Sequence, residues 1–237
     1  MPVFRLTRSL VFPPVCFAEP DGLLAVGGDL SLERLLLAYR EGIFPWYSKG
    51  YPVLWWSPDP RLVLFPDQLK ISKSLGRVLR KGCFRVTFDR SFVDVMEKCA
   101  QVPRKFGEGT WIVPEMVQAY QRLHLVGYAH SVEILYEGKL VGGLYGVSMG
   151  RVFFGESMFT EMTDASKVAL VYLVALLRRM GFVMIDCQVT TSHLQRLGAL
   201  EISRHEFMAR LREGIKGNVP VGLWSSEDIG PADVFSR

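Results

Sequence analysis

Residues 151–188 read RVFFGESMFTEMTDASKVALVYLVALLRRMGFVMIDCQ. Apolar, strand-like segments begin and end this stretch, and a long apolar pattern with helical spacing lies between them. Asp164 is a good N-cap for that helix, and Gly181 is a good residue to end it. A strand, a helix and a second strand in this order predict two parallel strands joined by a crossover.

Each predicted strand contains one acidic residue in otherwise apolar surroundings, Glu156 in the first and Asp186 in the second. Burying an ionised carboxylate without a partner is costly, so acids at such positions need a reason. One interpretation is a functional site at which the two strands bring the carboxyl groups together. The other is that both acids form buried ion pairs with arginines and do no chemistry.

Alternate side chains of a strand point to the same face, which predicts the neighbours of each acid. On the second strand, the face of Asp186 also carries three other side chains: Phe182, Met184 and Gln188. On the first strand, the face of Glu156 also carries two apolar ones: Phe154 and Met158. We therefore expect two acids, an amide and apolar surface to converge if the strands are adjacent.

The chain has 237 residues, enough for one large domain or for a main domain with a smaller one. Its 49% hydrophobic and 22% charged residues are typical of a globular protein. The longest apolar run, 168–177, is too short to span a bilayer, and Pro13 and Pro14 interrupt what would be the apolar part of a signal peptide. We therefore expect a cytoplasmic protein without membrane contact.

Motifs that carry known chemistry do not match. The four cysteines form no CxxC pair and the four histidines no HExxH motif, so we expect no metal site. GESMF (155–159) lacks the last glycine of a nucleophile elbow, and GGLYG (142–146) does not match GxGxxG. His130 and His193 are candidate acid–base residues, although a lone histidine is more often a hydrogen-bonded structural residue.

Residues 1–61 are predicted to form a small N-terminal domain rich in loops and aromatic residues. Trp46, Trp55 and Trp56 lie among prolines, which argues against a regular helix or a central strand at that point. One interpretation is a small irregular core that buries these rings against the main domain. The other is a set of flat surfaces on which a base could stack.

Residues 62–237 are predicted to form the main domain. Helical and strand-like runs follow one another, a polar loop closes on Trp111, and tight turns are expected at 137–138 and 149–150. Helices mixed with hairpin-linked strands indicate an α+β domain with a mixed sheet.

A basic stretch lies between Asp67 and Asp89, where no other acid occurs. It contains six cationic residues: Lys70, Lys73, Arg77, Arg80, Lys81 and Arg85. On a helical wheel the first five fall within an arc of roughly 100°, with the apolar residues opposite. Such a face suits a phosphate backbone, although an ordinary solvated face has the same pattern.

Several long motifs together resemble one family, the bacterial leucyl/phenylalanyl-tRNA–protein transferases. They span about residue 20 to about residue 200 and occur in this order: GLLAVGGDLS, YREGIFPWYS, LWWSPDPR, EGTWI, AYQRLHLVGYAHSVE, LVGGLYGV, FFGESMF, ASKVAL and IDCQV.

The resemblance implies a reaction and a fold. Members of that family move leucine or phenylalanine from Leu-tRNA or Phe-tRNA to a protein with an N-terminal Arg or Lys, which marks it for degradation by the N-end rule pathway. The family's main domain has the fold of the GCN5-related N-acetyltransferases, preceded by a small N-terminal domain, and the resemblance implies a monomer without a cofactor. The turn TEMTDASK (160–167) contains no glycine, which disfavours acetyl-coenzyme A as the donor.

The resemblance also implies site residues. The reacting centre would contain Asp186, Gln188 and Glu156, with Glu156 available for the cationic end of the acceptor. The pocket for the donor side chain would be lined by Trp46, Trp111, Tyr120, Leu144, Phe153, Met158, Leu173, Leu177 and Ile185. The tRNA would contact Lys73, Arg77, Arg80 and Lys81. The family pattern has Met at the position of Leu144 and Phe at those of Leu173 and Leu177, which leaves the leucine-versus-phenylalanine preference open. The alternative function is a tRNA-binding module without catalysis.

Overall fold

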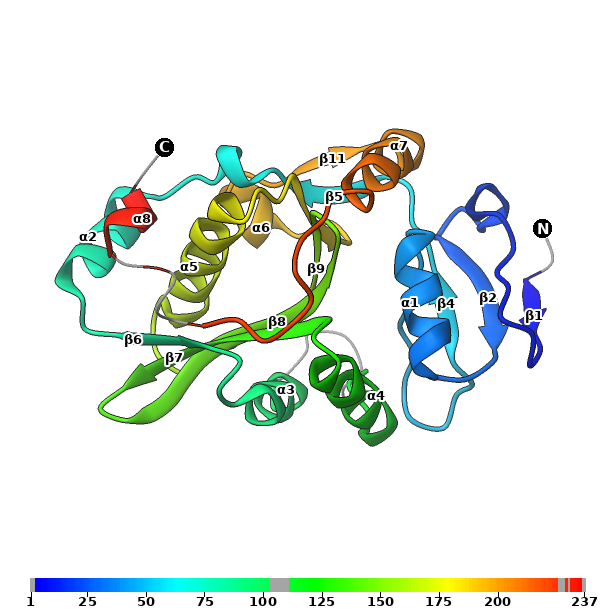
Figure 1. Cartoon of the computed structure of the whole chain (residues 1–237), viewed down its shortest axis with the longest axis horizontal. Coiled ribbons are helices and arrows are strands. Elements are labelled where there is room, and N and C mark those ends of the chain that lie inside the picture. The colour runs from blue at the N-terminus through cyan, green and yellow to red at the C-terminus, as the bar shows by residue number, and fades with distance from the viewer. Residues whose placement is uncertain (1–2, 103–110, 226–228, 230, 236–237) are drawn as a thin grey trace.

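The computed structural model describes residues 3–102, 111–225, 229 and 231–235. This part of the chain folds into two β-sheets and eight α-helices (Figure 1). The predicted polar loop before Trp111, and with it most of the EGTWI motif, lies outside the described residues. None of the described helices has the length and apolar character needed to cross a bilayer.

The N-terminal part of the chain contains a four-stranded sheet and one helix, α1 (Leu32–Arg40). The strands lie in the order β1–β2–β4–β3, with these bounds: β1 Phe4–Leu6, β2 Leu23–Gly27, β3 Phe44–Pro45 and β4 Leu54–Trp56. β4, which contains Trp55 and Trp56, lies between β2 and β3, so the prediction that these tryptophans are not in a central strand is wrong. Pro52 and Pro58 flank the three residues of β4 and do not interrupt them, so the missing proline N–H groups leave the strand's hydrogen bonds intact.

The tryptophans of this unit differ in their surroundings. Trp55 is fully buried, and its indole N–H donates to the Gly27 carbonyl over 2.8 Å. Trp46 is 41% exposed, and its carbonyl accepts a 2.7 Å hydrogen bond from the Trp56 indole. The core interpretation is therefore confirmed for Trp55 and in part for Trp56, which is partly buried and packs against the same core, but not for Trp46.

The large sheet has seven strands in the order β11–β5–β10–β9–β8–β7–β6. Their bounds are β5 Arg61–Leu64, β6 Arg85–Phe88, β7 Ala129–Tyr136, β8 Lys139–Met149, β9 Val152–Thr160, β10 Met184–Gln188 and β11 Leu200–Ile202. β9 and β10 are parallel, and the other neighbouring pairs are antiparallel. The predicted α+β domain with a mixed sheet is confirmed.

Helices cover both faces of the large sheet (Figure 1). α5 lies on one face, and α3 and α4 lie on the other, where the core is continuous with that of the N-terminal unit. The remaining helices have these bounds: α2 Lys73–Lys81, α3 Phe92–Gln101, α4 Pro114–Leu125, α5 Ala165–Arg179, α6 Ser192–Arg196, α7 Arg204–Gly214 and α8 Pro231–Phe235.

The predicted strand–helix–strand crossover is confirmed as β9–α5–β10. Asp164 occupies the N-cap position of α5, but its carboxylate pairs with Lys167 over 2.6 Å and does not cap the helix backbone. Gly181 ends the crossover helix in a left-handed conformation, with φ of 76°.

Two β-bulges change the predicted faces of β9 and β10. Tyr145 pairs with Ser157 and Gly146 with Gly155, so Glu156 is an extra residue on β9. Past this bulge the alternation reverses, and Met158 packs on the α5 side whereas Phe154 packs on the opposite side.

The face predicted for Phe182 is also wrong, because Phe182 is not part of the strand. This residue lies before β10 begins at Met184, and it packs on the α5 side, opposite Met184. A second bulge lies further along the strand, where Asp186 pairs with Val63 and Gln188 with Leu62, so that Cys187 is the extra residue.

Four elements of the main sheet and its coverings were not predicted: β5, β11, α7 and α8. β5 begins at Arg61, the last residue assigned to the N-terminal domain, and it lies beside β10. The domain division at residue 61 stays a prediction.

The Arg61–Asp186 ion pair joins β5 to β10 inside the protein. Nε donates to Oδ1 over 2.9 Å and Nη2 to Oδ2 over 2.7 Å, with both side chains fully buried. The guanidinium also lies over the Phe44 and Phe207 rings, at 4.9 and 4.4 Å. The ion-pair interpretation is therefore confirmed for Asp186.

Removing one member of this pair leaves the other charged and buried, so we expect Arg61→Met to lower the free energy of unfolding by about 3–5 kcal/mol. The double change Arg61→Met/Asp186→Leu removes both charges and should recover most of that loss. Urea unfolding measures both. Lys216→Met, which removes one side of the exposed pair with Glu213, is the control and should change stability by less than about 0.5 kcal/mol. A double variant as unstable as the single one would contradict this account.

Candidate functional site

A cavity lies where the two parallel strands separate. Backbone pairing of β9 with β10 ends at Phe154 and Asp186, and beyond this point each strand carries its bulge. The cavity has a volume of about 310 Å³, at the lower end of the range for small-molecule sites. Its wall is mostly apolar, and Glu156 and Gln188 are among the few polar side chains in it.

Glu156 is held by three hydrogen bonds from three different elements. The Tyr39 hydroxyl of α1 donates to Oε1 over 2.8 Å, and the Tyr120 hydroxyl of α4 donates to Oε2 over 3.1 Å. The Gln188 amide of β10 donates to Oε1 over 2.9 Å. The two hydroxyls also contact each other. The ion-pair interpretation is therefore wrong for Glu156, whose partners are two phenols and an amide.

Burial dominates the protonation of Glu156. It raises the pKa of the carboxyl group from 4.5 to about 7, against the hydrogen bonds from Tyr39, Tyr120 and Gln188, which lower it. Burial, and then the charge of Glu156, raises the pKa of Tyr39 and of Tyr120 well above 10, so both phenols keep their protons and remain donors. The site therefore contains a carboxyl group that can change its charge near neutral pH.

Asp186 lies behind this pair and not in the cavity wall. Its Oδ1 accepts the backbone N–H of Gln188 over 2.9 Å while both its oxygens bind Arg61. Gln188 itself has a left-handed backbone, with φ of 62°, which is uncommon for a residue other than glycine. The Asp186 carboxylate thus fixes the position from which the Gln188 side chain reaches Glu156.

Seven of the nine residues predicted for the donor pocket line this cavity: Trp46, Trp111, Leu144, Phe153, Met158, Leu173 and Ile185. The other two do not. Tyr120 is occupied with Glu156, and Leu177 is fully buried between α5 and the sheet. Four residues that were not predicted also line the cavity: Phe44, Pro45, Leu170 and Leu194.

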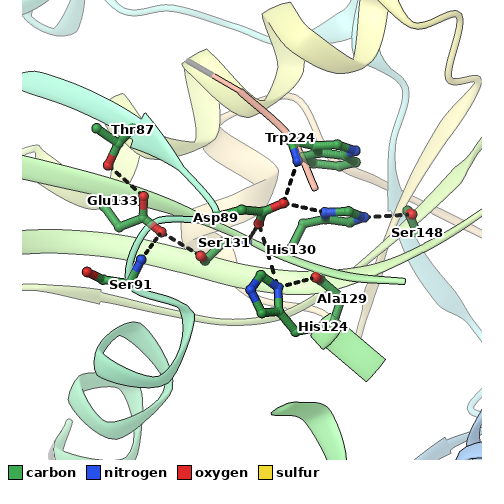
Figure 2. A network of polar contacts seen from close by, with 10 residues as sticks. All are labelled: Thr87, Asp89, Ser91, His124, Ala129, His130, Ser131, Glu133, Ser148 and Trp224. Atoms are coloured by element: carbon green, nitrogen blue, oxygen red, sulfur yellow. Dashed lines mark hydrogen bonds and ion pairs between the residues drawn. The ribbon is translucent and has the colours of Figure 1, made fainter. Parts of the chain in front are cut away.

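The two candidate histidines lie in different places. His193, on α6, lines the cavity. His130, on β7, is buried, and its two ring nitrogens contact Asp89 and Ser148, as Figure 2 shows. It is therefore a hydrogen-bonded structural residue. Cys187 also lines the cavity, but burial raises the pKa of its thiol, so it is not a thiolate nucleophile at neutral pH. Within the described residues, no cluster of histidine, cysteine and acidic side chains is arranged to hold a metal ion.

The basic face predicted for residues 70–81 lies mainly on α2. Four cationic side chains are exposed on this helix: Lys73, Arg77, Arg80 and Lys81. Ser72 caps the helix through Leu75 N–H, and Gly82 ends it with φ of 63°. Lys70 lies before the helix, and its backbone N–H pairs with Leu197, so the prediction that it belongs to the helical face is wrong.

Comparison with known proteins identifies related chains. A family model described as leucyl/phenylalanyl-tRNA protein transferase matches residues 63–212, and the model of that family's N-terminal domain matches residues 28–59. The leucyl/phenylalanyl-tRNA–protein transferase of Syntrophobacter fumaroxidans is 68% identical over 96% of this chain and 97% of its own. The protein of the same name from an Anaeromyxobacter species is 57% identical over 94% of this chain and 95% of its own.

Solved structures show a weaker likeness. L-PGS from Bacillus licheniformis is 13% identical, with a TM-score of 0.38 over 71% of this chain and 54% of its own. A GCN5-related N-acetyltransferase from Kribbella flavida is 10% identical, with a TM-score of 0.36 over 71% of this chain and 60% of its own.

The raised pKa of Glu156 predicts a pH-dependent stability. Between pH 4.5 and about 7 the folded protein keeps a proton on Glu156 that the unfolded chain has released. The free energy of unfolding should therefore fall as the pH rises through this window, by about 3 kcal/mol in total, and the loss should persist above it. Glu156→Gln should remove this contribution. Urea unfolding at pH 5, 6, 7 and 8 measures the difference between the two proteins, with the exposed Glu97→Gln as a control. A constant difference would show that Glu156 titrates normally.

Proposed function

The chain belongs to the leucyl/phenylalanyl-tRNA–protein transferase family, and we propose that the cavity beside Glu156 and Gln188 is where it transfers the amino acid. The protein is thus an enzyme, an aminoacyltransferase that takes its amino acid from tRNA. The observation that carries the proposal is an apolar cavity with a carboxyl–amide pair in its wall. An aminoacyl group needs both parts, because its side chain is apolar and its reacting atoms are polar.

The donor side chain would occupy the apolar part of the cavity. Leu144, Phe153, Leu173 and Ile185 provide surface without charge, which suits leucine or phenylalanine and disfavours polar side chains. A hydrophobic pocket separates two such side chains by only about 1–3 kcal/mol, so both can be donors.

Transfer needs no cofactor, because an aminoacyl ester is already activated. The α-amino nitrogen of the acceptor attacks the ester carbonyl carbon, a C–N bond forms, and the C–O bond to the tRNA ribose breaks. The proton lost by the nitrogen ends on the leaving ribose oxygen. A free α-amino group has a pKa of about 7.7–8.0, so part of it is neutral near pH 7, and orientation can supply much of the acceleration.

Gln188 and Glu156 have distinct roles in this proposal. The Gln188 amide N–H₂ is turned to Glu156, so its oxygen is the atom that accepts an N–H of the attacking amine. Glu156 pairs with the cationic side chain of an N-terminal Arg or Lys, and such a cation would favour the ionised carboxylate. Asp186 is a positioning residue, because it holds Gln188 through the backbone and does not reach the cavity.

The tRNA would lie along α2, whose cationic side chains suit a phosphate backbone. N-end rule degradation of the product, a monomeric state and a cytoplasmic location are further parts of the proposal and follow from the family resemblance. The alternative, a tRNA-binding module without catalysis, predicts binding without turnover.

The test of the proposed function uses purified protein, labelled Leu-tRNA, and peptides that begin with Arg, Lys or Asp. We expect transfer to the Arg and Lys peptides and none to the Asp peptide, because only a cation can pair with Glu156. Gln188→Ala should reduce the transfer rate strongly while tRNA binding is kept. Binding of tRNA by the unaltered protein without transfer to any peptide would favour the binding module.

The role of α2 is tested separately. Changing Lys73, Arg77, Arg80 and Lys81 together to Ala should weaken tRNA binding and make the slope of log affinity against log salt shallower by up to about 3.5 units, because the contribution is roughly 0.7–0.9 per phosphate contact. Filter binding at several salt concentrations measures this slope. The matched control changes four exposed cations elsewhere to Ala: Arg5, Lys139, Arg212 and Lys216. Equal slopes for the two variants would contradict the assignment.

A further inference from the structure

The segment that follows α7 passes the turn between β8 and β9 and the start of β7 before it reaches α8, since a Cβ at Gly150 would lie 2.6 Å from Ile215 and one at Gly127 would lie 2.6 Å from Gly222. In Figure 1 it is the orange-red loop that runs from α7 past β9 and then β8. Trp224 lies in this segment, only 8% exposed, and joins the core on the α5 side. It lies beyond residues 63–212, which the family model matches, and it is not part of the cavity wall.

The backbone at Trp224 is fixed by a buried carboxylate. Its N–H donates to Asp89 Oδ2 over 2.7 Å, and the same oxygen lies 2.8 Å from His130 Nδ1 (Figure 2). Asp89 Oδ1 accepts the N–H of Ser131 over 2.8 Å, and the far nitrogen of His130 contacts Ser148 over 3.1 Å. Asp89 and His130 are each 1% exposed at their side chains, so water does not compete for these bonds.

The indole of Trp224 lies between this network and the wall of the cavity. It stacks on His130 with the ring centres 3.7 Å apart and an angle of 2° between the planes. The indole also contacts Phe153, with the ring centres 5.8 Å apart, and it meets Phe182 edge-on at 6.2 Å. Phe153 in turn lines the cavity.

Phe153 is fully buried and packs closely against the neighbouring strand. A Cβ added to Gly146 would lie 2.6 Å from two atoms of the Phe153 ring, so the ring rests directly on the backbone of β8. Since well-packed interiors respond to the loss of neighbouring volume, the position of Phe153 depends on what lies behind it. That neighbour is Trp224.

We propose that Trp224 is a specificity-determining positioning residue, which supports Phe153 from behind and thereby sets how deep a donor side chain can enter the cavity. This inference rests on the proposed function, because it takes the cavity as the site of the donor side chain. Trp224 acts through Phe153 and does not touch the substrate.

A smaller residue at position 224 lets Phe153 move back, which deepens the cavity. A deeper cavity suits phenylalanine better than leucine, because leucine leaves the added space unfilled. The ratio of phenylalanine to leucine transfer should therefore rise, by about tenfold for a change of one or two methylene equivalents.

The experiment offers Leu-tRNA and Phe-tRNA in competition to the unaltered protein and to three variants, with an Arg peptide as acceptor. The ratio of the two products should rise from Trp224→Phe to Trp224→Leu to Trp224→Ala. Thermal melting identifies variants that fail to fold, and Trp224→Phe, the mildest change, must still shift the ratio in the same direction. Ile229→Ala is the matched control, because Ile229 is buried in the same C-terminal region and the same core cluster. It should leave the ratio unchanged.

A second arm asks whether the effect passes through Phe153. In a Phe153→Leu background, adding Trp224→Leu should change the ratio much less than it does in the unaltered protein. The inference is overturned if folded Trp224 variants keep the original ratio, or if both backgrounds respond equally. No transfer by the unaltered protein would instead overturn the proposed function.

Discussion

The site depends on one hydrogen bond between two bulged strands, that from Gln188 to Glu156. β9 and β10 pair in parallel for three positions and then separate, which opens a cavity in an otherwise continuous sheet. Each strand has an extra residue at the point of separation, and these bulges turn an acid and an amide toward each other. The apolar wall and the polar pair thus come from the same break in the sheet.

The surrounding structure supports this pair from both sides. Behind it, Arg61 and Asp186 join β5 to β10, and Asp186 also holds the backbone of Gln188. In front of it, the N-terminal unit contributes the Tyr39 hydroxyl to Glu156 and places Phe44 and Trp46 in the cavity wall. The small unit is therefore part of the site, and its core is continuous with the α3–α4 side of the main sheet. A buried carboxylate with a pKa near 7 results from this enclosure.

The local part of this arrangement was predictable from sequence. The apolar segments around Glu156 and Asp186, with a capped helix between them, predicted the parallel crossover and drew attention to both acids. The bulges were not predictable, because a strict two-residue alternation contains no sign of an extra residue. Met158 was therefore assigned to the wrong face, whereas Phe182 was assigned wrongly because it lies before β10 begins. Partners such as Arg61, Tyr39 and Tyr120 are distant in sequence, and β5 is a short strand between prolines. Trp224 gave no signal at all, because its contacts are with residues far away in sequence, among them Asp89, His130 and Phe153.

The most direct test of the central claim is a structure of the protein with an analogue of the donor, an adenosine that carries leucine through a stable amide at its 3′ carbon. The account predicts that the leucine side chain lies between β9 and β10 against Phe153 and Ile185, with its carbonyl carbon beside Gln188, where the amine of an acceptor would attack, and with Glu156 left for the cationic side chain of that acceptor. A leucine side chain bound elsewhere, with this cavity unchanged, would contradict the account.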